Sequence, residues 1–126
     1  MNVPEDLLYT DEHEWIKGVS DTRVRIGITD YAQDQLGDVV FVELPEVEAE
    51  VEKGDLIVEV ESTKSVGEVY APFSGTIATV NDEVAHTPEL VNESPYERAW
   101  FAEIETDGAY PTDGLLDASA YRDLTE

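Results

Sequence analysis

Residues 56–80 read LIVEVESTKSVGEVYAPFSGTIATV, and this stretch decides the fold. Residues 56–60, 66–70 and 76–80 are rich in valine, isoleucine, threonine and tyrosine, which favour β-strands. The segments between them, residues 61–65 and 71–75, are rich in the serine, glycine and proline that form turns. Short strands separated by close turn signals are typical of an all-β sandwich or barrel. The first turn places Lys64 at the tip of a predicted hairpin.

The rest of the chain continues this pattern. Further strands are expected at residues 24–28, 39–42, 47–52 and 100–104. Because residues 39–42 (VVFV) are continuously apolar, both faces of that strand are expected to be covered. Residues 81–98 contain Pro88 and Pro95 and are expected to be irregular.

Two helices are predicted. Residues 29–37 read as a short helix, with Asp30 and Gln33 spaced like a capping box and Gly37 as its stop. In the tail, Leu116, Ala120 and Leu124 recur at helical spacing and predict a packing stripe on a C-terminal helix. The predicted fold class is therefore mostly β, with one helix in the N-terminal half and one at the C-terminus.

Length and composition predict a single globular domain over residues 1–126. The hydrophobic share of 41% can fill the core of such a domain. The absence of cysteine excludes disulfides, thiolate nucleophiles and cysteine-bound zinc. The N-terminal residues resemble no signal peptide, and no apolar run approaches the ~20 residues that span a bilayer. A cytoplasmic location without membrane binding is expected.

The charge is extreme, with 30 acidic residues against 7 basic ones and a formal net charge of -23. Such a surface repels phosphate backbones, so nucleic acids and anionic membranes are not expected as partners. The acids are scattered and do not form the spaced loop of a calcium site, so no metal is expected. Because dissolved salt screens self-repulsion, we hypothesise a salt-adapted protein.

Residue patterns for catalysis are weak. His13 and His86 are the only histidines, and neither has metal-ligand spacing. His13, between two glutamates, has the neighbours of a general base, but the sequence favours a strand-end histidine on an acidic surface. The glycine-rich loops and nucleophile elbow of common enzyme classes are missing. The sequence therefore favours a protein that is not an enzyme.

Only three lysines exist: Lys17, Lys53 and Lys64. Lys17 and Lys53 each precede a glycine and read as surface turn residues. Lys64 differs because it lies between two apolar strands with small hydroxyl neighbours that leave its amine accessible. From the residues alone, a modified lysine and a plain surface lysine both remain open.

The surroundings of Lys64 resemble a known family. Glu61-Ser62-Thr63-Lys64-Ser65 is similar to the ES-x-K motif of the H protein of the glycine cleavage system, in which the lysine carries a lipoyl group. The resemblance extends along the chain in order. It includes His13-Glu14-Trp15, residues 27–40, Glu43-Leu44-Pro45, residues 70–75, residues 88–96, Trp100 and residues 115–121.

The chain departs from the family pattern at three positions. Glu48 stands where the family usually has glycine, and Gly67 stands where it usually has serine. Ala99 stands where glycine is frequent. The first departure predicts a different turn before the following strand, and the second affects the loop after Lys64.

The resemblance implies a flattened β sandwich, a barrel-sandwich hybrid of the lipoyl-domain type. It implies a carrier whose covalent lipoic acid on Lys64 takes the methylamine group of glycine from one enzyme to another. The implied partners are a pyridoxal-phosphate glycine decarboxylase (P protein), an aminomethyltransferase (T protein), dihydrolipoamide dehydrogenase (L protein) and a lipoyl-attaching enzyme. Glu61, Ser62 and Gly75 are expected to support recognition and turn geometry and not to react.

Alternative functions remain at this level. A biotin carrier shares the fold, but its lysine usually lies between methionines, and the only methionine here is Met1. A lipoyl domain of a 2-oxoacid dehydrogenase complex is the closest chemical alternative, although it would lack the His13-Glu14-Trp15 start and the C-terminal leucine helix. An unrelated salt-adapted acid–base enzyme would need a clustered site, which the sequence does not display.

Overall fold

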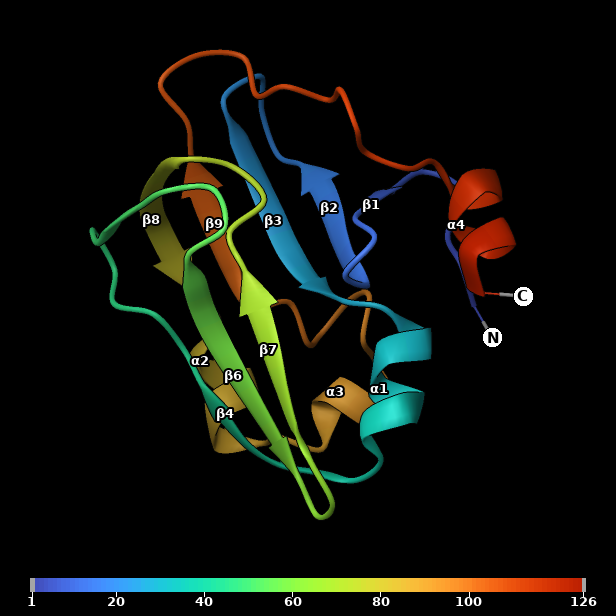
Figure 1. The fold of residues 1–126 in the computed structure, drawn as a ribbon. Coiled ribbons are helices and arrows are strands. Elements are labelled where there is room, and N and C mark those ends of the chain that lie inside the picture. Colours follow the sequence, from blue (N-terminus) through green and yellow to red (C-terminus); the bar gives the residue numbers. More distant parts are fainter. Residues whose placement is uncertain (1, 126) are drawn as a thin grey trace.

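The computed structural model describes residues 2–125 (Figure 1). Its strands are β1 (Leu8–Tyr9), β2 (Glu14–Gly18), β3 (Arg23–Ile28), β4 (Val39–Glu43), β5 (Glu50–Val51), β6 (Leu56–Ser62), β7 (Val66–Tyr70), β8 (Gly75–Val80) and β9 (Ala102–Glu105). Its helices are α1 (Asp30–Leu36), α2 (Asp82–His86), α3 (Leu90–Glu93) and α4 (Ala118–Thr125). None of the helices in residues 2–125 has the length and apolar character needed to cross a bilayer.

The strands form two antiparallel sheets. One sheet has six strands in the order β1-β2-β3-β9-β8-β5, and the other has three in the order β4-β6-β7. Figure 1 shows the three-stranded sheet lying over the six-stranded one. Their facing side chains make one core, to which β3 and β9 contribute Val24, Ile26 and Ile104, while β6 contributes Val58 and Val60. The predicted mostly-β sandwich is therefore confirmed.

A second, smaller core attaches the C-terminal helix. Tyr121 of α4 stacks on Tyr9, with ring centroids 4.7 Å apart, and Trp15 and Ala118 are buried in the same cluster. The predicted stripe of Leu116, Ala120 and Leu124 is wrong. Because α4 begins only at Ala118, its inward face carries Ala118 and Tyr121, and Leu124 is 50% exposed.

Three other expectations about local structure need correction. Residues 39–42 were expected to be covered on both faces, but Val40 and Phe41 are exposed, because β4 is an edge strand with a bulge. The expected strand at residues 47–52 is reduced to β5. Residues 81–98 are not irregular throughout, since they contain α2 and α3.

The α1 helix begins and ends near the predicted residues, but its cap differs. Thr29 is the N-cap, and its Oγ1 accepts a hydrogen bond from Ala32 N at 3.2 Å. Asp30 instead accepts from the Gln33 side chain at 2.7 Å. Gly37 ends the helix with φ 81°, a left-handed conformation that favours glycine.

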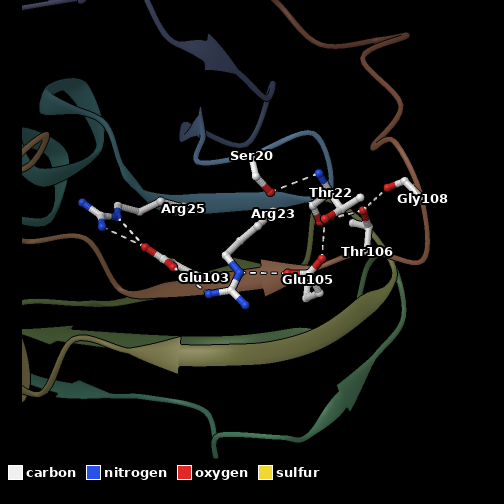
Figure 2. Close-up of polar contacts among 8 residues, drawn as sticks. All are labelled: Ser20, Thr22, Arg23, Arg25, Glu103, Glu105, Thr106 and Gly108. Carbon is white, nitrogen blue, oxygen red and sulfur yellow. Dashed lines mark hydrogen bonds and ion pairs between the residues drawn. The ribbon is translucent and has the colours of Figure 1, made fainter.

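The outer face of the six-stranded sheet carries a ladder of charges between β3 and β9 (Figure 2). The guanidinium of Arg25 donates to Glu103 Oε2 at 2.8 and 3.0 Å and lies 4.5 Å from the ring centroid of Trp100. Arg23 donates from Nε to Glu105 Oε1 at 2.8 Å. Arg25 neutralises the buried Glu103, whose Oε1 also lies 3.7 Å from Arg23 Nη1, in a protein that is otherwise strongly acidic.

Candidate functional site

Lys64 lies at the turn of the β6–β7 hairpin, which forms one extremity of the molecule in Figure 1. The pairing of Glu61 with Val66 is the last before the turn. Ser62 closes the turn, because its Oγ donates to Ser65 O at 3.1 Å and accepts from the backbone N–H groups of Lys64 at 3.3 Å and Ser65 at 3.0 Å. The lysine is exposed on a backbone that its own neighbours constrain.

A second segment of the chain supports the turn from the side. The backbone N–H of Thr63 donates to Asp38 O at 3.0 Å, at the junction between α1 and β4. The side chain of Lys64 crosses Gly37, where an added Cβ would lie only 3.2 Å from Lys64 Cε. A side chain at position 37 would crowd the aliphatic part of Lys64, and glycine avoids this contact.

The structure brings three of the four predicted site residues together. Glu61 and Ser62 lie at the end of β6, separated from Lys64 by Thr63, and Glu61 is exposed beside the turn. Gly75 lies elsewhere, at the start of β8 in the other sheet. A Cβ at Gly75 would come within 2.3 Å of Glu105 O, so this glycine allows the close approach of β8 to β9.

The other two lysines occupy different settings. Lys17 lies on β2 in the six-stranded sheet, opposite Arg25. Lys53 lies in the turn before β6, at the opposite end of that strand from Lys64, and its backbone N–H donates to Ser74 Oγ at 3.0 Å. Neither lysine is at the tip of a hairpin between two apolar strands.

A small cleft opens near the lysine turn, between α1 and the β6–β7 hairpin. Its volume is about 110 Å³. Apolar side chains form its walls, and two exposed carboxylates, Glu12 and Glu68, lie at its rim. The apolar wall residues are Ile28, Ala32, Leu36, Val60 and Val69. The cleft suits a group that combines a hydrocarbon chain with a positive charge.

His13 also lines this cleft. Its backbone has φ 68°, its ring lies 4.7 Å from that of Tyr31, and Nδ1 is 2.7 Å from the Tyr121 hydroxyl. Burial lowers the pKa of His13, which favours the neutral imidazole. His13 is therefore half-buried, and its contact with Tyr121 joins α4 to the turn between β1 and β2.

The sequence marks Glu14 only as part of the His13-Glu14-Trp15 resemblance, with no role of its own, and the structure places it beside the lysine hairpin. It is 3% exposed, and its carboxylate accepts from Tyr70 N at 2.7 Å and from Thr10 Oγ1 at 3.2 Å. Burial raises its pKa to about 7. Glu14 thus joins the six-stranded sheet to the base of the lysine hairpin. Alternation along β2, which places Glu14 on the same face as the core residue Ile16, was the available signal.

The structure shows the setting of each of the three residues that depart from the family pattern, Glu48, Gly67 and Ala99. Glu48 has φ 74°, a conformation that glycine adopts without strain. A Cβ at Gly67 would meet Leu36 side-chain carbons at 3.1 and 3.2 Å, so glycine here lets Leu36 lie over β7. Ala99 is buried in the main core. Among residues 2–125, no group of three histidine or acidic side chains is arranged to hold a metal ion.

Comparison with known proteins gives a consistent result. The family model of the glycine cleavage H-protein matches residues 7–126. The glycine cleavage system H protein of Staphylococcus carnosus is 50% identical over 124 residues, covering 98% of each chain. That of Bacillus subtilis is 48% identical over 126 residues, covering 100% of this chain and 98% of the relative.

The fold agrees with the sequence match. The crystal structure of a glycine cleavage system H protein from Mycobacterium marinum superimposes with a TM-score of 0.88 at 39% identity, covering 98% of both chains. These matches do not favour the alternative of a 2-oxoacid dehydrogenase domain. The chain belongs to the glycine cleavage H-protein family and is a carrier component of the glycine cleavage system.

Proposed function

We propose that this protein performs its carrier role through a lipoyl group linked by an amide to Lys64, in a single carrier domain over residues 1–126. The observation that carries the proposal is the exposed lysine at the tip of the β6–β7 hairpin, whose turn is braced by Ser62 and by Asp38 O. A modifying enzyme needs an amine that is accessible and held at a fixed place, and this turn offers both.

The surroundings of the turn fit such a group. Lys64 lies over Gly37, the residue after Leu36, and Leu36 forms a wall of the small cleft. The apolar walls would hold the hydrocarbon part of the lipoyl chain. The rim carboxylates Glu12 and Glu68 would attract a protonated amine, because opposite charges nearby favour the cation. When bound, the lipoyl group would supply a dithiolane whose S–S bond opens, so that one sulfur takes the aminomethyl group of glycine, the other becomes a thiol, and the carboxyl group leaves as CO2.

The protein contributes position and electrostatics to this chemistry. His13 is held in its neutral form by burial, so it adds no positive charge that would repel an amine in the cleft. The walls restrict access of water to a group bound there. The partners in this role would be the glycine decarboxylase, the aminomethyltransferase, dihydrolipoamide dehydrogenase and a lipoyl-attaching enzyme.

A glycine exchange assay tests the proposal. Lipoylated protein, purified glycine decarboxylase and labelled bicarbonate should give exchange into the carboxyl group of glycine. We expect Lys64→Arg to abolish exchange, because arginine keeps the charge but is not a substrate for lipoylation. The control Lys53→Arg should leave exchange unchanged. Exchange that survives in Lys64→Arg would contradict the proposal, as would efficient reductive acylation by a 2-oxoacid dehydrogenase.

A second experiment addresses the cleft. The double variant Glu12→Gln/Glu68→Gln removes both rim charges without touching the lysine turn. We expect normal lipoylation but exchange slowed by roughly two- to thirtyfold, since exposed opposite charges contribute about 0.2–1 kcal/mol each and two are removed. Glu89→Gln/Glu97→Gln, a pair of exposed acids not among the cleft residues, is the matched control. Equal exchange in both double variants would argue against the cleft.

A further inference from the structure

We propose that Asn92 is a positioning residue for Lys64. Its side chain holds the α1–β4 junction, residues 37–39, in the conformation on which the lysine turn rests. This inference deepens the proposed function and rests on lipoylation of Lys64. It adds a residue that lies outside both the hairpin and the cleft, on the short helix α3.

The amide of Asn92 uses both of its ends. Its Oδ1 accepts from Val39 N at 2.9 Å, and its Nδ2 donates to Gly37 O at 2.8 Å and to Gln33 Oε1 at 2.9 Å. A backbone N–H can only donate and a backbone carbonyl can only accept, so these partners fix which way the amide faces. Both protons of Nδ2 are used. Asn92 therefore fastens the end of α1 to the start of β4.

The fastened junction is the support of the lysine turn. Asn92 binds residues 37 and 39, and the residue between them, Asp38, accepts the hydrogen bond from Thr63 N at 3.0 Å. The stem of Lys64 lies against Gly37 itself. The pairing of β4 with β6 begins at Val39 and Ser62. Residues 37–39, which Asn92 holds in place, therefore contact three consecutive residues of the turn, Ser62, Thr63 and Lys64.

The junction needs such a clamp for a physical reason. Gly37 is in a left-handed conformation, where glycine is conformationally permissive, and the β4–β6 register shifts between Val39 and Phe41. Neither helix nor regular sheet ladder therefore fixes the backbone at this point. Without the Asn92 amide, the carbonyl of Gly37 and the N–H of Val39 lose a partner, and the support of Thr63 becomes free to move. The hairpin would remain, but the place of its tip would vary.

The test compares Asn92→Ala with a matched control, Asn81→Ala. Asn81, the residue before α2, is a buried asparagine whose Nδ2 bridges two backbone carbonyls, those of Arg98 at 2.7 Å and Trp100 at 2.8 Å. These side-chain bonds do not reach residues 37–39 or the lysine turn. Both variants lose an amide clamp. The unmodified proteins are assayed with a purified lipoyl-attaching enzyme at a temperature well below both melting midpoints.

We expect kcat/KM for lipoylation of Asn92→Ala to fall roughly tenfold, because a misplaced reacting group loses rate even when its chemistry is intact. Asn81→Ala should match wild type. Acylation of Lys64 by a small soluble reagent should be equal in all three proteins, since it requires no docking. Heteronuclear relaxation should show increased motion of the Thr63, Lys64 and Ser65 amides in Asn92→Ala alone.

The possible results distinguish failure of the Asn92 proposal from failure of the proposed function. Normal lipoylation and an unchanged lysine turn in Asn92→Ala would overturn the proposal, as would an equal loss in Asn81→Ala. If Asn92→Ala does not fold, Asn92→Ser, which leaves a smaller hole, is measured in its place with the same expectation and the same contradiction. If wild type itself is not modified on Lys64, the proposed function fails, and this result is distinct from failure of the Asn92 inference.

Discussion

At the scale of single residues, Glu48 and Glu14 each have an unfavourable setting, Glu48 because of its backbone conformation and Glu14 because its carboxylate is buried. Glu48 has a positive φ in an exposed loop, and Glu14 is buried at the base of the lysine hairpin. The first is a backbone strain and the second an electrostatic one. Each gives a prediction in which a single substitution improves stability.

Glu48→Gly should raise the free energy of unfolding by about 1 kcal/mol, because a non-glycine residue in the left-handed region costs roughly 1–2 kcal/mol and glycine loses more chain entropy on folding. Urea denaturation at fixed salt measures the change. Glu48→Gln is the control, since it removes the charge and keeps the strain. If Glu48→Gln stabilises the protein as much as Glu48→Gly, charge repulsion and not backbone strain is responsible.

Glu14→Gln should change how stability depends on pH. The pKa of Glu14 is raised by burial from 4.5 to about 7, so the folded state keeps the proton over a range in which the unfolded state has lost it. Ionisation of Glu14 therefore lowers the free energy of unfolding as pH rises through this window. Glutamine can still accept from Tyr70 N but has no proton to lose.

The measurement is urea denaturation of both proteins from pH 4.5 to pH 8 at constant high salt. The variant should gain on wild type by about 3 kcal/mol across the window, since one pKa unit corresponds to about 1.4 kcal/mol. Most of the gain should appear below pH 7. Parallel curves for the two proteins would show that Glu14 does not titrate in this way.

The sequence allowed prediction of some of these residues and not of others. The place of Lys64 follows from two apolar strands and a serine-rich turn, which are local patterns. Asn92 and Glu14 act on residues 55 or 56 positions away in the chain, at Gly37 and Tyr70. Such contacts depend on how the sheets pack, and no local pattern encodes them.

At the scale of secondary-structure elements, β3, which alternates along its sequence, and the β6–β7 hairpin, which is bounded by clear turn residues, were predicted well. The error at residues 39–42 has a physical cause. A continuous apolar run fits a doubly covered strand, but β4 lies at a sheet edge and leaves Val40 and Phe41 exposed. The C-terminal helix was predicted, but its inward face was not, because its start was placed too early.

The β3–β9 pair offers a prediction about its charge ladder. Arg25→Met should destabilise the protein by about 2 kcal/mol, because it leaves the carboxylate of Glu103, which is 5% exposed, without its main partner. This cost is below that of a fully buried pair, since the Arg25 side chain is 32% exposed. The double variant Arg25→Met/Glu103→Met should recover most of the loss. Thermal and urea denaturation of wild type, Arg25→Met, Glu103→Met and the double variant complete the cycle, and additive losses would contradict the coupling.

At the scale of the whole molecule, the net charge of -23 remains unbalanced by the few ion pairs between described residues. The acids are spread over both sheets and the loops. The folded state therefore repels itself more strongly than the expanded chain does. The proposal of salt adaptation rests on this self-repulsion of the folded state.

The melting midpoint should rise strongly with potassium chloride, because the Debye length falls from about 10 Å at 0.1 M to about 3 Å at 1 M. An uncharged osmolyte at equal osmolality is the control, since it stabilises by exclusion without screening. A midpoint that does not depend on salt, or that rises equally with the osmolyte, would contradict salt adaptation.

Mass mapping of the protein purified from its own cells tests the central claim most directly. Trypsin cleaves after unmodified lysine and arginine, and Lys64 is the only such residue between Lys53 and Arg98. A lipoyl group on Lys64 blocks cleavage there, so the account predicts one uncut peptide of residues 54–98 that carries a single lipoyl group. Separate peptides of residues 54–64 and 65–98, or a lipoyl group on Lys17 or Lys53, would contradict it.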